Sequence, residues 1–120
     1  MGELVAGVWQ SSGVETVLNG GTLQRPPSVF RNWIGDSDDV SGAPGIFPAE
    51  SGRYHLYISL ACPWAHRTLI MRSLKGLQDI IGLSVAHWLM GDDGWSFQTG
   101  PGVVPDTVNG AQWLHQLYTP

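Results

Sequence analysis

The hydrophobic pattern is clearest in the second half of the chain. Residues 54–58 read Tyr-His-Leu-Tyr-Ile, an aromatic and β-branched run that is typical of a strand. Residues 83–90 are apolar on both faces of an extended chain, which predicts a strand covered on both sides. Residues 65–77 between them are predicted to form a helix. Together they form a βαβ unit, whose crossover is almost always right-handed.

The predicted helix carries an apolar stripe because Ile70, Leu74 and Leu77 recur at i, i+4 and i+7. We expect this stripe to face the core of an α/β domain. One such unit leaves a two-stranded sheet with a long unpaired apolar edge, which is not a finished domain.

A loop is expected after the second strand, because residues 91–106 contain six glycines and prolines. Loops longer than about 12–15 residues are usually functional or disordered. Asp106 or Asn109 is the candidate cap of a last helix, which carries apolar residues between 111 and 118.

The first 52 residues differ in composition and are rich in glycine, proline and serine. This composition predicts a loop-rich N-terminal extension over residues 1–52 rather than strands that complete the sheet. Residues 53–120 then hold a partial α/β domain. We therefore expect the chain to be a fragment.

Charge and composition exclude several classes of protein. The net charge is −4 and no basic run is present, so no nucleic acid partner is expected. No apolar stretch approaches the roughly 18 residues that cross a membrane, and no secretory signal is visible. The single cysteine cannot form an internal disulfide, which favours the cytoplasm.

Six tryptophans are many for 120 residues of which 13% are charged. Large rings on a weakly charged surface indicate a binding site for a ligand or another protein segment. A tryptophan-rich core explains the composition equally well, and the sequence leaves both interpretations open.

The candidate catalytic residue is Cys62, in the run Cys62-Pro63-Trp64-Ala65. Proline favours the first position of a helix, so the thiol precedes a helix whose dipole and first N–H groups stabilise a thiolate. Because position 65 is alanine, an oxidised intermediate must be resolved by an outside thiol, for which glutathione is the abundant choice. A buried, inert cysteine is the structural alternative.

The residues after Cys62 offer weaker chemistry. Cys62 and His66 are too few for a zinc site, and His66 points along the helix axis, so we expect a packed or surface histidine. Arg67 either adds positive charge near the thiolate or pairs with a carboxylate. No metal site is expected.

The remaining polar clusters are interpreted as structural. Three carboxylates without further ligands are a weak calcium signal, so a solvated turn is expected for the acidic cluster Asp36, Asp38 and Asp39. The other three histidines are scattered along the chain. They are His55, His87 and His115.

Trp95 lies in the predicted glycine-rich loop. Indole rings in such loops often cover a ligand, but a ring that fixes the loop to the core fits the sequence equally well.

Four blocks of the sequence, in order, resemble the glutathionyl-hydroquinone reductases, or Xi-class glutathione transferases. Residues 54–68 resemble the family's active-site signature. Residues 30–34 resemble its N-terminal extension, 94–97 its loop, and 108–118 its next helix.

The resemblance implies a thioredoxin-like, glutathione-binding domain over 53–120 and a mechanism. The thiolate of Cys62 attacks the sulfur that joins glutathione to a hydroquinone ring, and a mixed disulfide forms. A second glutathione releases oxidised glutathione. Trp95 matches the position that packs on glutathione. Glutathione is therefore the implied co-substrate, glutathionyl-hydroquinones are the substrates, and the family is usually homodimeric.

The resemblance also implies what is missing. Family members continue with two strands, which carry the cis-proline loop and a Glu-Ser pair, and with a helical C-terminal domain, absent here. We expect weak or no turnover by the 120 residues alone. Two alternatives stay open: an omega-like or one-cysteine thiol transferase that acts on mixed disulfides, and a non-catalytic fragment.

Overall fold

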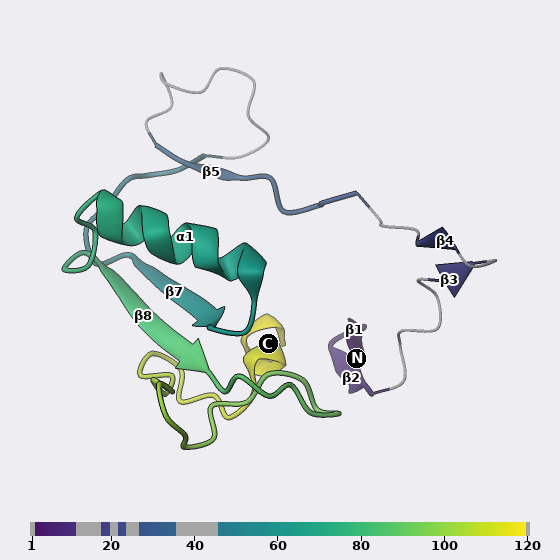
Figure 1. Ribbon diagram of the computed structural model, residues 1–120. Helices are drawn as coiled ribbons and strands as arrows, with labels where there is room; N and C mark the ends of the chain where they lie inside the picture. Colours follow the sequence, from purple (N-terminus) through teal and green to yellow (C-terminus); the bar gives the residue numbers. More distant parts are fainter. Residues whose placement is uncertain (1, 12–17, 20–21, 24–26, 36–45, 120) are drawn as a thin grey trace.

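The computed structural model describes residues 2–11, 18–19, 22–23, 27–35 and 46–119 (Figure 1). Its centre is the βαβ unit of strand β7 (Tyr54–Ser59), helix α1 (Pro63–Leu74) and strand β8 (Ile81–Ala86). The two strands pair in parallel, with Tyr54 opposite Ile81 and Ser59 opposite Ala86. The α/β prediction is confirmed, and so is the two-stranded sheet.

Helix α1 begins and ends earlier than the predicted range of 65–77. Pro63 takes the first helical position, where its missing N–H is not needed. The helix ends because Gly76 adopts a left-handed conformation at φ +64°. The N–H of Gly76 donates to the Ser73 carbonyl at 3.1 Å, and the N–H of Leu77 donates to the Arg72 carbonyl at 2.9 Å. This pair of bonds is the Schellman motif, which satisfies carbonyls at a helix end.

The helix is also rotated relative to the predicted stripe. Ile70 and Leu74 are 42% and 75% exposed, so the prediction that they face the core is wrong. The half-buried positions of α1 are instead Ala65, Leu69 and Arg72, again at i, i+4 and i+7. The Arg72 guanidinium donates to the Ile81 carbonyl at 2.8 Å, which holds the helix against the start of β8.

Strand β8 stops at Ala86 rather than continuing to residue 90. The backbone N–H of His87 donates to the Ser96 carbonyl at 2.8 Å, so the chain leaves the register of β7 at this point. Trp88 and Leu89 follow at 47% and 69% exposure, outside the sheet. The burial of residues 84–86 nevertheless confirms a strand covered on both faces at its end.

The long loop after β8 is ordered by backbone hydrogen bonds. Val85 exchanges both backbone bonds with Val104, at 2.9 and 3.0 Å, and the N–H of Phe97 donates to the Gln112 carbonyl at 2.9 Å. The last predicted helix is only the 3₁₀ helix η2 (Leu114–Tyr118). It starts late because the Gln116 side-chain oxygen accepts the N–H groups of residues 112 and 113 and holds them outside the helix.

The N-terminal part contains short strands, which its composition did not predict. Each has two or three residues, and they pair as β1 with β2, β3 with β4, and β5 with β6, the last pair in parallel. The strands are β1 (Glu3–Val5), β2 (Val8–Gln10), β3 (Leu18–Asn19), β4 (Thr22–Leu23), β5 (Trp33–Ile34) and β6 (Ile46–Phe47). Such short strands are compatible with a composition rich in turn residues, because each pair needs only a few residues in an extended conformation.

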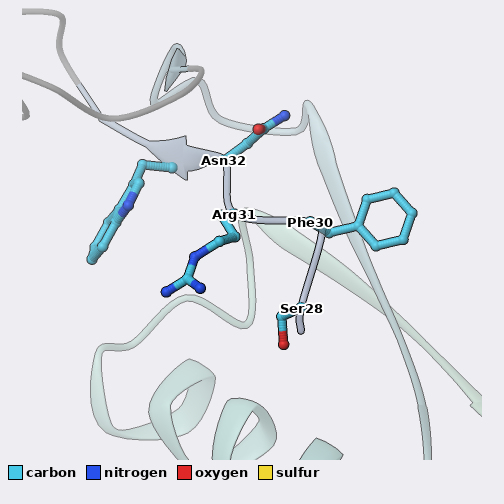
Figure 2. Close-up of a pocket in the computed structure, with 5 residues that line it drawn as sticks. Ser28, Phe30, Arg31 and Asn32 are labelled. Atoms are coloured by element: carbon cyan, nitrogen blue, oxygen red, sulfur yellow. The ribbon is translucent and has the colours of Figure 1, made fainter. Parts of the chain in front are cut away.

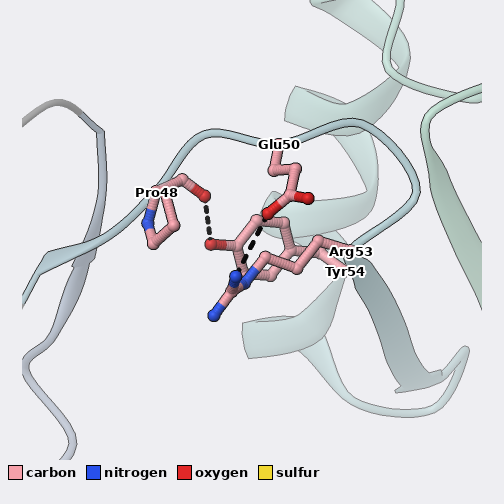
Figure 3. A network of polar contacts seen from close by, with 4 residues as sticks. All are labelled: Pro48, Glu50, Arg53 and Tyr54. Carbon is pink, nitrogen blue, oxygen red and sulfur yellow. Dashed lines mark hydrogen bonds and ion pairs between the residues drawn. The ribbon is translucent and has the colours of Figure 1, made fainter.

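A polar turn leads from the N-terminal part into β7 (Figure 3). The Tyr54 hydroxyl donates to the Pro48 carbonyl at 2.5 Å, and Arg53 pairs with Glu50 at 3.1 Å. The ion pair is exposed, so it contributes little stability. The N–H of Gly52 donates to the Ile80 carbonyl at 3.0 Å, which aligns the starts of β7 and β8.

The core is small and is formed by the ends of β7 and β8 and by the loop that follows β8. The buried apolar side chains of the described residues are Ile58, Val85, Ala86 and Phe97. None of the six tryptophans is buried, so the interpretation of a tryptophan-rich core is wrong. Within the described part of the chain, no helix has the length and apolar character needed to span a bilayer.

We predict that Gly76→Ala destabilises the fold by about 1 kcal/mol, because a Cβ is strained at φ +64°. No atom lies within 4 Å of an added Cβ at this position, so the cost comes from the backbone alone. Gly91→Ala is the matched control, since Gly91 also has open space and no positive φ. Urea unfolding of both variants measures the difference, and equal midpoints would contradict the Schellman assignment.

Candidate active site

The single thiol of the chain lies at the junction of β7 and α1. Cys62 is the N-cap residue of α1, with extended backbone at φ −95° and ψ 109°. Its carbonyl accepts the first hydrogen bond of the helix, from the N–H of His66 at 3.2 Å. The residue is half-buried, and its thiol makes no capping hydrogen bond. The predicted position at the positive end of a helix dipole is confirmed.

Ser59 shapes the turn in front of the thiol. The backbone N–H of Cys62 donates to the Ser59 carbonyl at 3.0 Å. The buried Ser59 hydroxyl accepts the N–H of Ala61 at 3.3 Å and donates to the His87 carbonyl at 3.4 Å. One serine therefore fixes the turn that carries Cys62 and joins it to the end of β8.

The first turn of α1 presents an exposed aromatic and a cation. The Arg67 guanidinium lies 4.7 Å from the centre of the Trp64 ring, and Trp64 is 58% exposed. Among the described residues Arg67 forms no ion pair, so of its two open interpretations the pairing with a carboxylate is not observed, and the guanidinium makes a cation–π contact instead. His66 is exposed, in agreement with its interpretation as a surface residue.

Trp95 lies in the loop between β8 and η2 and is half-buried. Its carbonyl accepts the N–H of Leu114 at 2.8 Å, and both residues after it are buried. Its side chain lines an apolar cavity of about 190 Å³ together with Leu4 and Trp9 from the N-terminal hairpin. The loop therefore holds Trp95 in one place, at the surface of the molecule.

Cys62 and Trp95 are joined through other residues. The Ser59 hydroxyl reaches the His87 carbonyl, and the N–H of His87 donates to the carbonyl of Ser96, next to Trp95. The cavity that Trp95 lines is not lined by Cys62. The structure thus brings the two candidate residues to the same end of the sheet, on separate segments that share hydrogen bonds.

A buried carboxylate orders the later part of the loop that contains Trp95. Asp106 accepts hydrogen bonds from the Tyr57 hydroxyl at 2.9 Å and from the backbone N–H groups of residues 108, 109 and 111 at 2.9–3.2 Å. Burial raises the pKa of Asp106, but these donors outweigh it and lower the pKa to about 2. Burial, followed by the hydrogen bond to Asp106, raises the pKa of Tyr57. The Asn109 amide donates to the same hydroxyl at 3.1 Å.

The sequence named Asp106 only as a candidate helix cap. In the structure it closes a turn over residues 106–111 instead, three residues before η2 begins. Tyr57, its partner across 49 positions, gave no signal in the sequence.

The described histidines have structural contacts, as expected. His55 hydrogen-bonds the Ser84 hydroxyl at 2.8 Å, and its ring leaves no room for a Cβ at Gly82. His87 stacks on Trp88 with ring centres 3.9 Å apart, and His115 stacks on Trp9 at 4.8 Å.

The described residues contain no group of three or more potential metal ligands. The acidic cluster Asp36, Asp38 and Asp39 lies outside the residues that the structure describes.

Residues 28–33 surround a separate open cavity of about 390 Å³, lined by Ser28, Phe30, Arg31, Asn32 and Trp33 (Figure 2). Phe30 is 87% exposed and Trp33 is 58% exposed. Neither candidate site residue lines this cavity.

Comparison with curated proteins finds close relatives. The glutathionyl-hydroquinone reductase YqjG of Escherichia coli is 50% identical over 98% of this chain and 37% of its own length. The glutathionyl-hydroquinone reductase PcpF of Sphingobium chlorophenolicum is 46% identical over 99% of this chain and 35% of its own length. The omega-like glutathione S-transferase 2 of Schizosaccharomyces pombe is 43% identical over 82% of this chain. No protein-family model matches the sequence.

Comparison with solved structures finds glutathione transferases as well. The Xi-class glutathione transferase of Natrialba magadii matches 98% of this chain with a TM-score of 0.75 and 41% identity. The chain is homologous to part of the Xi-class glutathione transferases. The glutathione-bound structure of YqjG matches 60% of the chain with a TM-score of 0.58 and 57% identity. The chain spans about a third of the length of the reductases that it matches.

This homology confirms the thioredoxin-like fold class that the resemblance implied. The roles of Cys62 and Trp95 remain predictions.

We predict that the buried Asp106 makes stability depend on pH. Its pKa is lower in the folded state than the ordinary 3.8, so its contribution is complete above about pH 4 and is lost as the pH falls through about 2. The shift corresponds to about 2 kcal/mol. Asp106→Asn should remove this contribution and flatten the stability profile between pH 4 and 2. Urea unfolding at several pH values measures it.

The matched control for this prediction is Asp93→Asn, because Asp93 is exposed in the same loop. That variant should keep the pH profile of the parent chain. An unchanged profile in Asp106→Asn would show that the carboxylate does not stabilise the loop.

Proposed function

We propose that the chain carries the nucleophile of a glutathione-dependent reductase that removes glutathione from glutathionyl-hydroquinones. The observation that supports this most directly is the placement of Cys62, the only cysteine, as the N-cap of α1. The first N–H groups and the dipole of a helix favour an anion at this position. Relatives named as glutathionyl-hydroquinone reductases, at 46–50% identity, support the choice of substrate.

The proposed reaction has two thiol-exchange steps. The Cys62 thiolate attacks the glutathione sulfur of the conjugate, and a Cys62–glutathione disulfide forms as the bond from sulfur to the ring carbon breaks. The ring carbon keeps the electron pair and takes a proton, which gives the free hydroquinone. The thiolate of a second glutathione then attacks the disulfide, which forms oxidised glutathione and restores Cys62. One conjugate and one glutathione thus give one hydroquinone and one oxidised glutathione.

Two features of the site support an exchange with an outside thiol. Position 65, where a second cysteine could resolve the disulfide, is alanine and half-buried. Cys62 itself is only half-buried, so a second glutathione can reach the sulfur. A one-cysteine enzyme of this kind uses glutathione as co-substrate and fits a reducing compartment, the cytoplasm.

Trp95 is proposed to pack against the bound glutathione. Its loop is fixed through Leu114 and Ser96, and Ser96 is joined through His87 to the serine that shapes the Cys62 turn. An indole held in this way offers a broad apolar face at little entropic cost.

We predict that incubation with a glutathionyl-hydroquinone leaves glutathione on Cys62, because the first step stores the tripeptide as a mixed disulfide. Intact-mass spectrometry and peptide mapping measure the adduct, and added glutathione should remove it. Cys62→Ser should stay unmodified.

The sharper control moves the thiol away from the helix start. In the double variant Cys62→Ser, Ser73→Cys the only thiol lies exposed in the last turn of α1. This end of the helix disfavours a thiolate, so the adduct should be absent or much slower. Equal adduct formation by the double variant, or an unmodified parent chain, would refute the proposed role of Cys62.

A second function follows from the omega-like relative at 43% identity. A thiol transferase of this type would reduce protein–glutathione mixed disulfides through the same cysteine.

We predict that the conjugate reacts faster than a glutathionylated peptide under matched conditions, because the reductase proposal assigns the ring-bound sulfur as the target. The rate of adduct formation at Cys62 measures both substrates. A clear preference for the peptide would favour the transferase, and reaction with neither would favour a non-catalytic fragment.

A further inference from the structure

The side chain of Trp9, in β2, contacts the loop that carries Trp95. The Trp9 indole N–H donates to the backbone carbonyl of Asp92 at 3.0 Å. The same ring stacks on His115 of η2, with ring centres 4.8 Å apart and planes 13° apart. One side chain from the start of the chain therefore contacts both the loop and the helix that follows it. In Figure 1 the β1–β2 hairpin lies beside η2.

Gly94 is a second, independent observation that the loop packs closely against the Trp9 ring. It is buried, it adopts φ +83°, and it directly precedes Trp95. A Cβ at this position would lie 3.0 Å from Cζ2 and 3.1 Å from Cη2 of Trp9. Such contacts are tighter than most that packed side chains make, so the absence of a side chain at Gly94 lets the indole lie close to the backbone.

The β1–β2 hairpin also lies next to Trp95 itself. Leu4 and Trp9 line the same apolar cavity as Trp95. On either side of Trp95 the loop is also fixed by backbone bonds, among them those from His87 to Ser96 and from Leu114 to Trp95. The turn over residues 91–94 lies outside the segments that these backbone bonds hold. Its hydrogen bond to a distant segment is the one that the Trp9 indole donates to Asp92.

We propose that Trp9 is a positioning residue, which holds the 91–94 turn so that Trp95 is kept ready to receive glutathione. This inference depends on the proposed function, because it assigns Trp9 a role in that same site. Trp9 touches no reacting atom and acts through the loop. If the loop held its position only a tenth of the time, the apparent dissociation constant of a ligand that needs it would rise about tenfold.

Two measurements on Trp9→Ala test the proposal. Amide hydrogen exchange should become faster in peptides that cover residues 91–97, while peptides from β7 keep their protection. The conjugate concentration that gives half the limiting rate of adduct formation at Cys62 should rise several-fold, with the limiting rate unchanged. Alkylation of Cys62 by iodoacetamide, which needs no glutathione site, should keep its rate.

Three variants complete the test. Val8→Ala removes an exposed apolar side chain from the same strand and should behave as the parent chain. Trp9→Phe keeps a ring against His115 and Gly94, loses the bond to Asp92, and should restore most of the affinity. Trp95→Ala should weaken the conjugate reaction at least as much as Trp9→Ala.

The outcomes separate the two proposals. The positioning role is overturned if amide hydrogen exchange over residues 91–97 is unchanged in Trp9→Ala. It is also overturned if exchange becomes faster but the conjugate concentration at half the limiting rate does not rise. In either case Trp95→Ala still tests whether Trp95 binds the conjugate. If Trp95→Ala has no effect on the conjugate reaction, the proposed role of Trp95 fails and the inference fails with it. If the parent chain forms no adduct, the proposed function is refuted directly.

Discussion

The parallel pairing of β7 with β8 determines where the other parts of the candidate site lie. Parallel strands joined by a helix end at the same edge of their sheet, so the turn after Ser59 and the loop after Ala86 must be neighbours. The Ser59 hydroxyl then bonds across this edge to the His87 carbonyl. A slip of the register would separate the thiol from the loop that carries Trp95, even if both segments kept their local structure.

As many polar as apolar side chains are buried in the described part of the chain. The buried residues include four apolar side chains, but also Ser59, Ser84, Ser96 and Asp106. Every buried side-chain nitrogen and oxygen in the described part of the chain has a hydrogen-bond partner. Such a network specifies one arrangement of a loop that has few apolar contacts of its own. The loop of residues 87–113 is therefore ordered without regular secondary structure.

The sequence predicted the elements whose signals are local. Tyr54–Ser59 is a strand by composition, and Pro63 fixes the start of α1, so the position of Cys62 followed from adjacent residues. The rotation of α1 was missed because its apolar residues and its half-buried residues form different stripes, and only packing distinguishes them. The end of β8 was missed because its cause, the carbonyl of Ser96, lies nine positions beyond His87.

The same limit applies to the site. Cys62 and Trp95 were predicted from local sequence and from the family resemblance, whereas Trp9 is 83 positions from Asp92 in the chain and Tyr57 is 49 from Asp106. Local sequence patterns do not predict contacts between residues so far apart in the chain.

The chemistry of a lone thiol places a further demand on its surroundings. In the proposed cycle two different molecules must reach the same sulfur, first the conjugate and then a second glutathione. A fully buried cysteine would exclude the second thiol, and a fully exposed one would lose the orientation that the helix start provides. Cys62 satisfies both demands, because its backbone is fixed by Ser59 and by His66 while its side chain stays half-buried. In that cycle, recognition of glutathione must come from groups that leave the sulfur open. The role proposed for Trp95, on a separate segment held by backbone bonds, meets this requirement.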